Sequence, residues 1–589
     1  MKKVFLVSSL LSFGVLTFHA QTNYWQQTVD YLIDADLNDK ENKAVCHETI
    51  IYENNSPDTL KEIYLHLYWN AFVKGSHAFE FQNNDQKEIQ ADEFGSIWVS
   101  SIIVNDEVLE IAVFESIGKV KLTKPILPGG KAEINLDFVS YIPKCLNRSG
   151  RNNTAGTDFT FTQWYPKICR YDKQGWHTDP YFGREFAGTF GNFQVNIVCD
   201  SSFTIAGTGQ PLNKTYTPNG WKNSDGSPVK SNRVNWTFTA QNVHDFAWAA
   251  ERDWTYDKKT IDGVEFQFFY GNYNKDQWED LIKNWEKSYA ICKKEFGPYP
   301  YPQFSFIQGG EGYMEYPMCT MLEASRSDFY NTACHEFMHN YFYGIYGSDE
   351  NLHHWMDEGI TCYAEARIAN IFNNEIFPAR DAYSSYSWMR MISTEEPIAT
   401  AANHFMEDYA YYNAAYFKGQ LFPEMIRYII GDNRMKEGFM RYYEKWSFKH
   451  PEPNDFVKIF EDVSGMELTW FQNYWLNTTH TIDVGLGSVI KRKTGIELSL
   501  SREGIPVPIE LEVLLKNGSK RYFYIPVDLT NNIKTDFNNP TELLPTWSSA
   551  RKEHKVLIPA KYKEIESITI DPSQILPDVN EENNFKTLE

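Results

Sequence analysis

The sequence predicts a multidomain α+β protein with an N-terminal antiparallel β saddle or sandwich, a central, mainly helical domain and a C-terminal β-sandwich. From Tyr24 to about Arg252, short apolar runs alternate with turn-forming residues, which is typical of antiparallel sheets. Apolar residues then recur at helical spacing, and the last part of the chain returns to short β-forming runs. The 589 residues are too many for one hydrophobic core and indicate about three domains.

Residues 1–20 have the features of a cleavable secretory signal peptide. Met1–Lys3 is basic, Val4–Phe18 is mostly apolar, and the small residue Ala20 precedes the expected cleavage point. The apolar run is short for a membrane span, and no later stretch approaches about 18 apolar residues. We therefore expect export to the periplasm or the extracellular space, with no membrane span in the mature chain. An uncleaved anchor is the less favoured alternative.

The charge and the cysteines narrow the class of protein. The chain has 78 acidic and 56 basic residues, a formal net charge of −22, which argues against binding to nucleic acid. The eight cysteines show no CxxC pair and no regular spacing, so disulfides are not expected to be the main source of stability. Cys334 is expected to be a packed thiol rather than a metal ligand.

The first two domains differ in their periodicity. Residues 21–252 carry short strand-like runs such as Phe193–Val198, separated by turn signals such as Pro128–Gly130. A stripe of apolar residues at helical spacing then runs from Trp278 to Phe296 and opens the helical domain, residues 253–482.

The strongest motif lies inside a helix expected over Asp328–Gly344. His335, Glu336 and His339 form an HExxH sequence. Because positions i and i+4 lie on one face of a helix, the two imidazoles can bind one Zn²⁺ together, with Glu336 in reach of a bound water. The competing interpretation is an ordinary helix with two hydrogen-bonded histidines.

A second segment, His353–Thr361, contains Glu358, which lies 19 positions beyond His339. With the HExxH motif it resembles the gluzincin metallopeptidases, and specifically the M1 aminopeptidase family. The resemblance implies a thermolysin-like catalytic domain in which His335, His339 and Glu358 bind zinc and leave one position for water. Glu336 is then the general base. Asp357 replaces an Asn of the family and is expected either to support a ligand or to be solvated.

The run Gln308–Pro317 resembles the M1 G-x-M-E-N signature, in which the Glu binds the free α-amino group of the substrate. The resemblance implies that Glu315 takes this role, because a carboxylate gives a cationic amine a charge-assisted hydrogen bond. Tyr316 stands where the family has Asn. The remaining substrate-binding candidates of this segment are Gly312, Tyr313 and Met314.

Two further segments resemble M1 enzymes. Thr162–Pro166 implies that Gln163 is a candidate wall residue of the substrate pocket, although an ordinary loop amide is an equal alternative. Ala415–Gly419 resembles the Y-x-K-G segment, which implies that the Tyr416 hydroxyl donates to the oxyanion of the tetrahedral intermediate. Tyr411 is a weaker candidate. Pro423 is expected to kink or restart the helix that follows.

Residues 483–589 are predicted to form the C-terminal β-sandwich. Val507–Leu515, a turn at Asn517-Gly518 and Arg521–Val527 give a clear hairpin signal. The region resembles the small β-sandwich of M1 enzymes, and the large C-terminal helical domain of many members is not expected. A more open cleft that admits longer peptides would follow.

The sequence therefore predicts a secreted zinc aminopeptidase that uses one Zn²⁺ per chain and hydrolyses peptides with a free N-terminus. One alternative is another metallohydrolase activity on the same site, such as endopeptidase cleavage or epoxide opening. A second is a catalytically silent, zinc-binding scaffold. Hydrolysis of N-acetylated peptides would distinguish an endopeptidase from the predicted aminopeptidase. Metal analysis of the Glu336→Ala variant would distinguish a silent scaffold from an enzyme.

Overall fold

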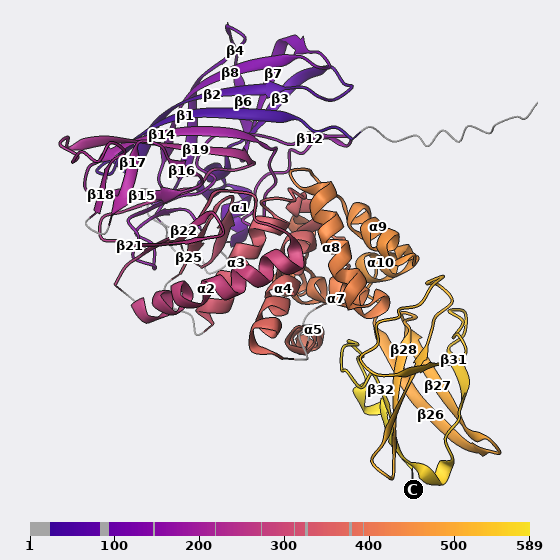
Figure 1. Ribbon diagram of the computed structural model, residues 1–589. Coiled ribbons are helices and arrows are strands. Elements are labelled where there is room, and N and C mark those ends of the chain that lie inside the picture. The colour runs from indigo at the N-terminus through magenta and orange to yellow at the C-terminus, as the bar shows by residue number, and fades with distance from the viewer. Residues whose placement is uncertain are drawn as a thin grey trace, which may run out of the picture.

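The computed structural model describes residues 24–82, 93–144, 148–217, 220–272, 274–310, 312–323, 328–375, 380–392 and 394–588. The predicted signal peptide lies outside the described residues, as does Cys145. Along the described chain a β-rich region, a mainly helical region and a second β-rich region follow one another (Figure 1), so the predicted fold class is confirmed. None of the described helices combines the length and apolar character that crossing a bilayer requires.

The N-terminal region is built on an eight-stranded sheet with the order β16-β19-β14-β1-β2-β8-β4-β5. Buried and more exposed residues alternate along its long strands, so one face packs against the rest of the protein. The sheet is antiparallel except that β1 and β14 run parallel. The strands are β1 (Thr28–Asn38), β2 (Lys43–Glu53), β4 (Ser96–Val104), β5 (Glu107–Val108), β8 (Lys131–Tyr141), β14 (Gly191–Asp200), β16 (Gln210–Pro211) and β19 (Arg233–Val243).

Two four-stranded sheets and two hairpins complete this region. Tyr31 of the large sheet packs edge-on against Tyr165, and Trp164 contacts both Tyr165 and Trp248 of β20, so an aromatic core joins the sheets. The elements are β3 (Leu60–His66), β6 (Ile111–Phe114), β7 (Ile117–Ile126), β9 (Gly150–Arg151), β10 (Phe159–Phe161), β11 (Lys167–Ile168), β12 (Tyr171–Asp172), β13 (Gly175–Trp176), β15 (Thr204–Gly207), β17 (Lys214–Thr217), β18 (Gly220–Asn223), β20 (Trp248–Glu251) and the short helix α1 (His77–Gln82).

The middle region contains a five-stranded sheet, β21-β22-β23-β25-β24, against which α3 packs. Phe337 of α3 lies 5.0 Å from Phe304 of the sheet and 4.9 Å from Trp285 of α2, between ring centroids. This buried aromatic contact holds the helix that carries the HExxH motif. The strands are β21 (Thr255–Ile261), β22 (Val264–Tyr270), β23 (Gln303–Gln308), β24 (Met314–Tyr316) and β25 (Cys319–Leu322).

Helix α4 packs against α2, α3 and α7, and α7 in turn packs against α8 and α9. Gly359 lets α4 approach α7 closely, because an added Cβ would lie 2.6 Å from the Gly419 carbonyl carbon. The helices are α2 (Lys275–Phe296), α3 (Phe329–Phe342), α4 (Glu350–Asn373), α5 (Arg380–Ile392), α6 (Asp408–Tyr412), α7 (Lys418–Ile430), α8 (Asp432–Trp446), α9 (Pro453–Ser464) and α10 (Thr469–Asn477).

Helix α7 continues through Pro423, so the helix does not restart there, which was one of the two outcomes expected at this residue. The irregular geometry lies earlier, in a π-helical turn over Asn413–Phe417 that joins α6 to α7. Such wide turns place a side chain away from the regular helical stripe and are frequent at functional sites. Tyr416 is in this turn.

The C-terminal region contains sheets of three and five strands. The predicted hairpin is confirmed, with β28 and β29 paired antiparallel around Asn517-Gly518. Arg380 pairs with Glu581, which links α5 to this region. The strands are β26 (Ile482–Arg492), β27 (Gly495–Gly504), β28 (Ile509–Leu515), β29 (Lys520–Ile525), β30 (Thr541–Leu543), β31 (Glu553–Ile558), β32 (Ile565–Ile570) and β33 (Phe585–Thr587).

Candidate metal and catalytic site

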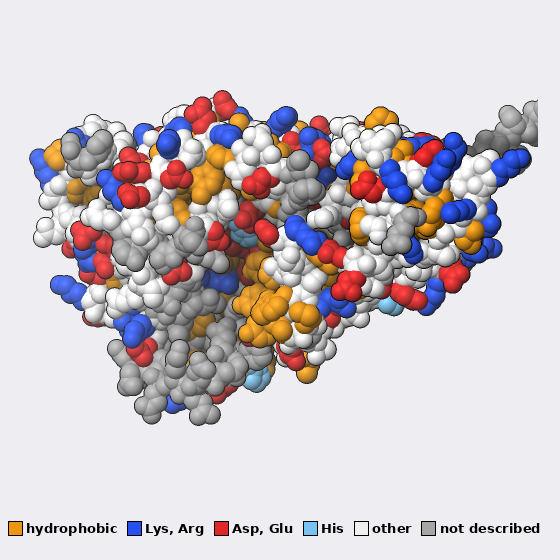
Figure 2. Space-filling model, turned by 90° about the horizontal axis from the view of Figure 1, so that it is seen from below, with side chains coloured by type: hydrophobic (Ala, Val, Ile, Leu, Met, Phe, Trp, Pro, Cys, Tyr) orange, Lys and Arg blue, Asp and Glu red, His pale blue; other side chains and the backbone are white. Residues whose placement is uncertain are grey.

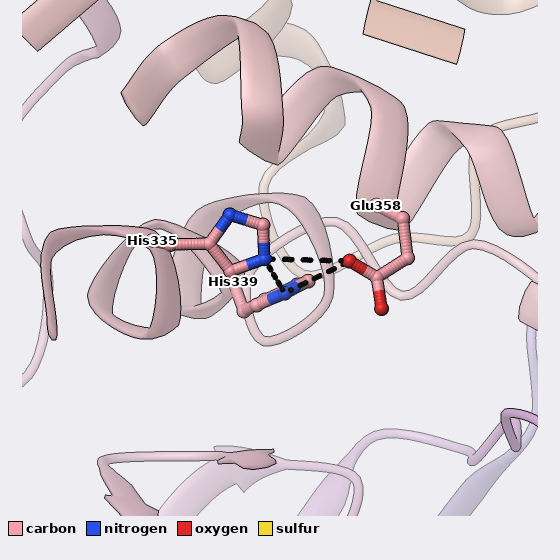
Figure 3. A group of neighbouring side chains, drawn as sticks. All are labelled: His335, His339 and Glu358. Atoms are coloured by element: carbon pink, nitrogen blue, oxygen red, sulfur yellow. Dashed lines mark hydrogen bonds and ion pairs between the residues drawn. The ribbon is translucent and has the colours of Figure 1, made fainter. Parts of the chain in front are cut away.

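Helices α3 and α4 bring His335, His339 and Glu358 together (Figure 3). The two histidine Nε2 atoms lie 3.0 Å apart, and each lies 3.4 Å from Glu358 Oε2. The three side chains come from one turn of α3 and a facing turn of α4. They are largely buried, with His339 1% exposed and Glu358 4% exposed.

This arrangement fits a metal ion. With zinc–ligand bonds of about 2.0–2.1 Å, neighbouring ligand atoms of a tetrahedron lie about 3.3–3.4 Å apart, close to the distances found here. Glu358 Oε2 is buried and has no hydrogen-bond partner among the described residues. A buried carboxylate oxygen without a partner is costly, and a cation between the three side chains would satisfy it.

Two carboxylates orient the histidine rings from behind. Asp357 Oδ1 lies 2.6 Å from His339 Nδ1, and Glu365 Oε2 lies 3.1 Å from His335 Nδ1. Each contact turns the Nε2 atom of its ring toward Glu358. Asp357 is fully buried, so the alternative of a solvated carboxylate is wrong. The sequence interpretation missed Glu365, although its position seven residues after Glu358 places both on one face of α4.

Glu336 lies beside the proposed ligands and lines the cleft in front of them. Burial raises the pKa of Glu336 to about 7. A carboxylate with a pKa near neutrality can both accept and return a proton. The geometry therefore allows the general-base role that the motif predicts.

The hydroxyl of Tyr416 donates to Glu358 Oε1 at 2.6 Å. Burial raises the pKa of Tyr416 well above its usual range, so the hydroxyl keeps its proton. The ring of Tyr411 packs under the Arg184 guanidinium at 4.2 Å, and Tyr411 is not among the described residues that line the cleft. Tyr412, four positions before Tyr416, lines the cleft in its place.

Glu315 lies on the edge strand β24 and lines the cleft next to Tyr313 and Met314. Its side chain is buried, its Oε1 has no partner among the described residues, and burial raises the pKa of Glu315. Gly312, with a φ of +92°, precedes these residues. Gln163 is not among the cleft-lining residues; it is 3% exposed and accepts from the Tyr316 hydroxyl at 3.4 Å.

Three charged residues near Glu315 were missed in the sequence. Arg148 Nη1 lies 3.0 Å from Glu185 Oε2, and both residues line the cleft. The carboxylates of Glu185, Glu315 and Glu350 lie within 4.8 Å of one another. No sequence pattern relates them, because strand pairing and helix packing bring these distant residues together.

The cleft has a volume of about 580 Å³ and an acidic lining. Arg148 is the one Lys or Arg side chain among its described lining residues, which also include seven carboxylates. Such a lining favours a cationic group over an anionic one. The carboxylates are Glu185, Glu315, Asp328, Glu336, Glu358, Glu365 and Asp381.

The first turn of α4 is fixed by the N-terminal region. Asp349 caps the helix by accepting from the Leu352 backbone N–H, and it also lies 2.8 Å from His177 Nδ1. His177 Nε2 lies 2.9 Å from Asp172. Burial alone would lower the pKa of His177, but the two aspartates outweigh it and raise this pKa to about 9.

Parts of the chain are similar in sequence to known peptidases. Residues 305–475 match the family model described as the peptidase family M1 domain. Aminopeptidase B of Rattus norvegicus is 25% identical over 236 residues, which cover 35% of this chain and 35% of that protein. Aminopeptidase M1-D of Oryza sativa subsp. japonica is 22% identical over 214 residues, covering 32% of this chain and 24% of that protein. The chain thus spans about a third, or less, of the length of these relatives.

A solved structure, the M1 zinc metallopeptidase from Deinococcus radiodurans, has the same fold over most of its length. The TM-score is 0.56 at 15% sequence identity, and the match covers 77% of this chain and 94% of that one. The family-model match spans β23 to α10, so it includes α3, α4 and the π-helical turn.

Proposed function

Because the chain belongs to the M1 peptidase family, we propose that it is a zinc-dependent aminopeptidase, which hydrolyses the N-terminal peptide bond of peptides. His335, His339 and Glu358 hold one Zn²⁺. Glu315 anchors the free amine. The substrates are peptides with an unblocked N-terminus.

One observation carries this proposal. Oxygen or nitrogen atoms of Glu315, His339, Asp357 and Glu358 all lie within 4.8 Å of one another. Within one amino-acid residue, the amine nitrogen and the carbonyl oxygen are less than about 4 Å apart. A substrate amine at Glu315 therefore brings the carbonyl group of the same, first residue to the proposed ligands. This is the geometry of an exopeptidase.

The described side chains have defined roles in this reaction. Bound zinc supplies Lewis-acid chemistry, polarising the scissile carbonyl group and making a water molecule easier to deprotonate. Glu336 accepts the proton of the attacking water and passes it to the leaving amine. The Tyr416 hydroxyl, which now donates to Glu358, turns to the carbonyl oxygen as negative charge develops there.

A panel of aminoacyl reporters, assayed with and without a chelator, tests the proposal. We expect hydrolysis that the chelator abolishes and added Zn²⁺ restores, and at least about 100-fold slower hydrolysis of N-acetylated substrates. Glu336→Gln should retain zinc and lose about 100- to 10,000-fold in kcat, the usual contribution of a general base. Cleavage of N-acetylated peptides would instead identify an endopeptidase. Bound zinc without any hydrolysis would identify a silent scaffold.

We further propose that the protein is exported to the periplasm or beyond. The basic and apolar segments within residues 1–20 support this proposal. N-terminal sequencing of the protein recovered from the exported fraction should begin at Gln21. Recovery of the uncleaved chain from the cytoplasm would contradict it.

A further inference from the structure

Helix α5 forms one wall of the catalytic cleft. Asp381, Ala382, Ser385 and Met389 line the cleft from this helix. Another face of α5 contacts the C-terminal region, where the Tyr383 hydroxyl donates to the Asp578 carbonyl group. The C-terminal region therefore holds one side of the helix, and other residues of the helix line the cleft.

The cleft-lining face of α5 continues into exposed apolar side chains. Trp388 and Ile392 follow Ser385 at spacings of three and seven, so they lie on the same face of the helix. Trp388 is 51% exposed and Ile392 is 45% exposed. Tyr412 of the adjacent segment also lines the cleft and is 44% exposed.

Exposed apolar side chains are concentrated in this part of the chain. Figure 2 views the molecule of Figure 1 from below. Near the middle of this view, in the part of the molecule where α5 lies in Figure 1, hydrophobic side chains gather beside a hollow. Grouped apolar side chains of this kind are typical of ligand-binding grooves. The large apolar residues of this segment that are at least 44% exposed are Trp388, Met391, Ile392, Met406, Tyr409 and Tyr412.

The position of the amine decides which part of a peptide meets α5. The amine end of the cleft is made by Glu315, Glu185 and Arg148, which are charged and come from β24 and the N-terminal region. Helix α5 packs instead against α7 and the π-helical turn that carries Tyr416. When the amine of a peptide is bound at Glu315, the first carbonyl group of the peptide lies at the proposed metal ligands. The rest of the cleft, including the wall formed by α5, is left for the residues after the scissile bond.

We propose that the α5 stripe, defined as Ser385, Trp388, Met389 and Ile392, binds apolar side chains of the second and third residues of the substrate. The preferred substrates are peptides with a bulky apolar residue directly after the first one. This inference rests on the proposed aminopeptidase activity and specifies its substrate class. The driving force is the removal of apolar surface from water on both partners.

A series of tetrapeptides that differ only at the second residue tests the proposal. For the wild type, we expect kcat/KM with Leu or Phe at this position to exceed that with Ser or Asp by about 10-fold or more. Trp388→Ala should lower kcat/KM about 10-fold for the Leu and Phe peptides, mostly through KM, and less than about twofold for the Ser peptide. Trp388→Phe should keep most of the preference.

Trp98→Ala is the matched control, because Trp98 is 58% exposed, similar to Trp388, but lies on β4 and is not among the described residues that line the cleft. It should leave the selectivity unchanged. Calorimetric binding of the same peptides to the zinc-loaded Glu336→Gln variant gives a second measurement that does not need turnover. When Trp388→Ala is added to this variant, the Leu peptide should bind about 10-fold more weakly. The affinity for the Ser peptide should change little.

Three results would overturn the proposal. The first is equal kcat/KM for apolar and polar second residues in the wild type, and the second is an equal loss for all peptides in Trp388→Ala. The third is a Trp388→Ala variant that keeps the peptide selectivity but changes the molecular mass measured by sedimentation. That result would identify the stripe as a contact between two copies of the chain. Absence of any aminopeptidase activity in the wild type would instead contradict the proposed function.

Discussion

Asp357 and Glu365 each hold one histidine ring of the proposed metal site, and replacing them is expected to weaken zinc binding by different amounts. Asp357 is fully buried and lies 2.6 Å from His339 Nδ1. Glu365 is 29% exposed and lies 3.1 Å from His335 Nδ1. Because water weakens a hydrogen bond at an exposed carboxylate, the Asp357 contact should contribute more.

The magnitudes follow from the chemistry of each substitution. Asp357→Asn keeps an oxygen acceptor but removes the charge, and charge-assisted hydrogen bonds are about twice as strong as neutral ones. A loss of about 1.4 kcal/mol, or about 10-fold in Kd for zinc, is expected. Asp357→Ala removes the acceptor altogether and should reach about 100-fold, the upper end for residues that support metal ligands. Glu365→Gln should cost about threefold, since water can replace part of its contact.

Competition with a chromogenic chelator measures these affinities directly, and circular dichroism checks that each variant is folded. Thr361→Val is a suitable control, because the Thr361 hydroxyl lies 3.4 Å from His339 Nδ1 and should contribute little. A Glu365→Gln variant that loses as much affinity as Asp357→Asn would refute the reasoning that burial sets the difference.

Three further changes give expected outcomes. Glu185→Gln should raise KM for free-amine substrates about 10-fold, because it removes a charge close to Glu315 at the amine end of the cleft, and steady-state kinetics would show this. Gly359→Ala should destabilise the fold by about 1–3 kcal/mol in denaturant titration, because its Cβ would overlap the Gly419 backbone. His177 has a folded pKa of about 9, above its unfolded value of about 6.5, so its contribution of about 3 kcal/mol is complete below about pH 6.5 and lost as the pH rises through 9. Comparing His177→Gln with the wild type at pH 6 and pH 10 measures that loss.

The sequence predicted the features that depend on local periodicity. His335 and His339 share a helix face whatever the rest of the fold does, so the motif alone placed their rings together. The hairpin at Asn517-Gly518 followed from turn chemistry in the same way. Regular helical spacing could not relate Tyr411 to Tyr416, because Tyr416 lies in a π-helical turn, whose wider winding the sequence does not reveal.

Features that depend on tertiary packing could not be predicted. Arg148 and Glu185 come from the N-terminal region, and Glu315 from an edge strand of the middle region. Only the docking of these regions makes them neighbours, and single-sequence patterns carry no record of such docking. The burial of Gln163 and its contact with the Tyr316 hydroxyl at 3.4 Å depend on packing in the same way.

Helix α4 connects these local and long-range features. Its first residue, Glu350, accepts a hydrogen bond from the Phe186 backbone N–H at 3.3 Å, next to Glu185. Glu358 follows on α4 beyond a kink at His353, whose φ of −136° and ψ of 45° are not helical. A rotation of α4 by one residue would turn Glu358 by about 100° away from the histidines. The kink separates the start of α4, which the N-terminal region contacts, from the turn that carries Glu358. The hydrogen bond from the Tyr416 hydroxyl to Glu358 and the close approach of Gly359 to Gly419 of α7 act on the second part directly. The N-terminal region therefore sets the amine end of the cleft, while the packing of α4 against α7 and the π-helical turn holds the third ligand.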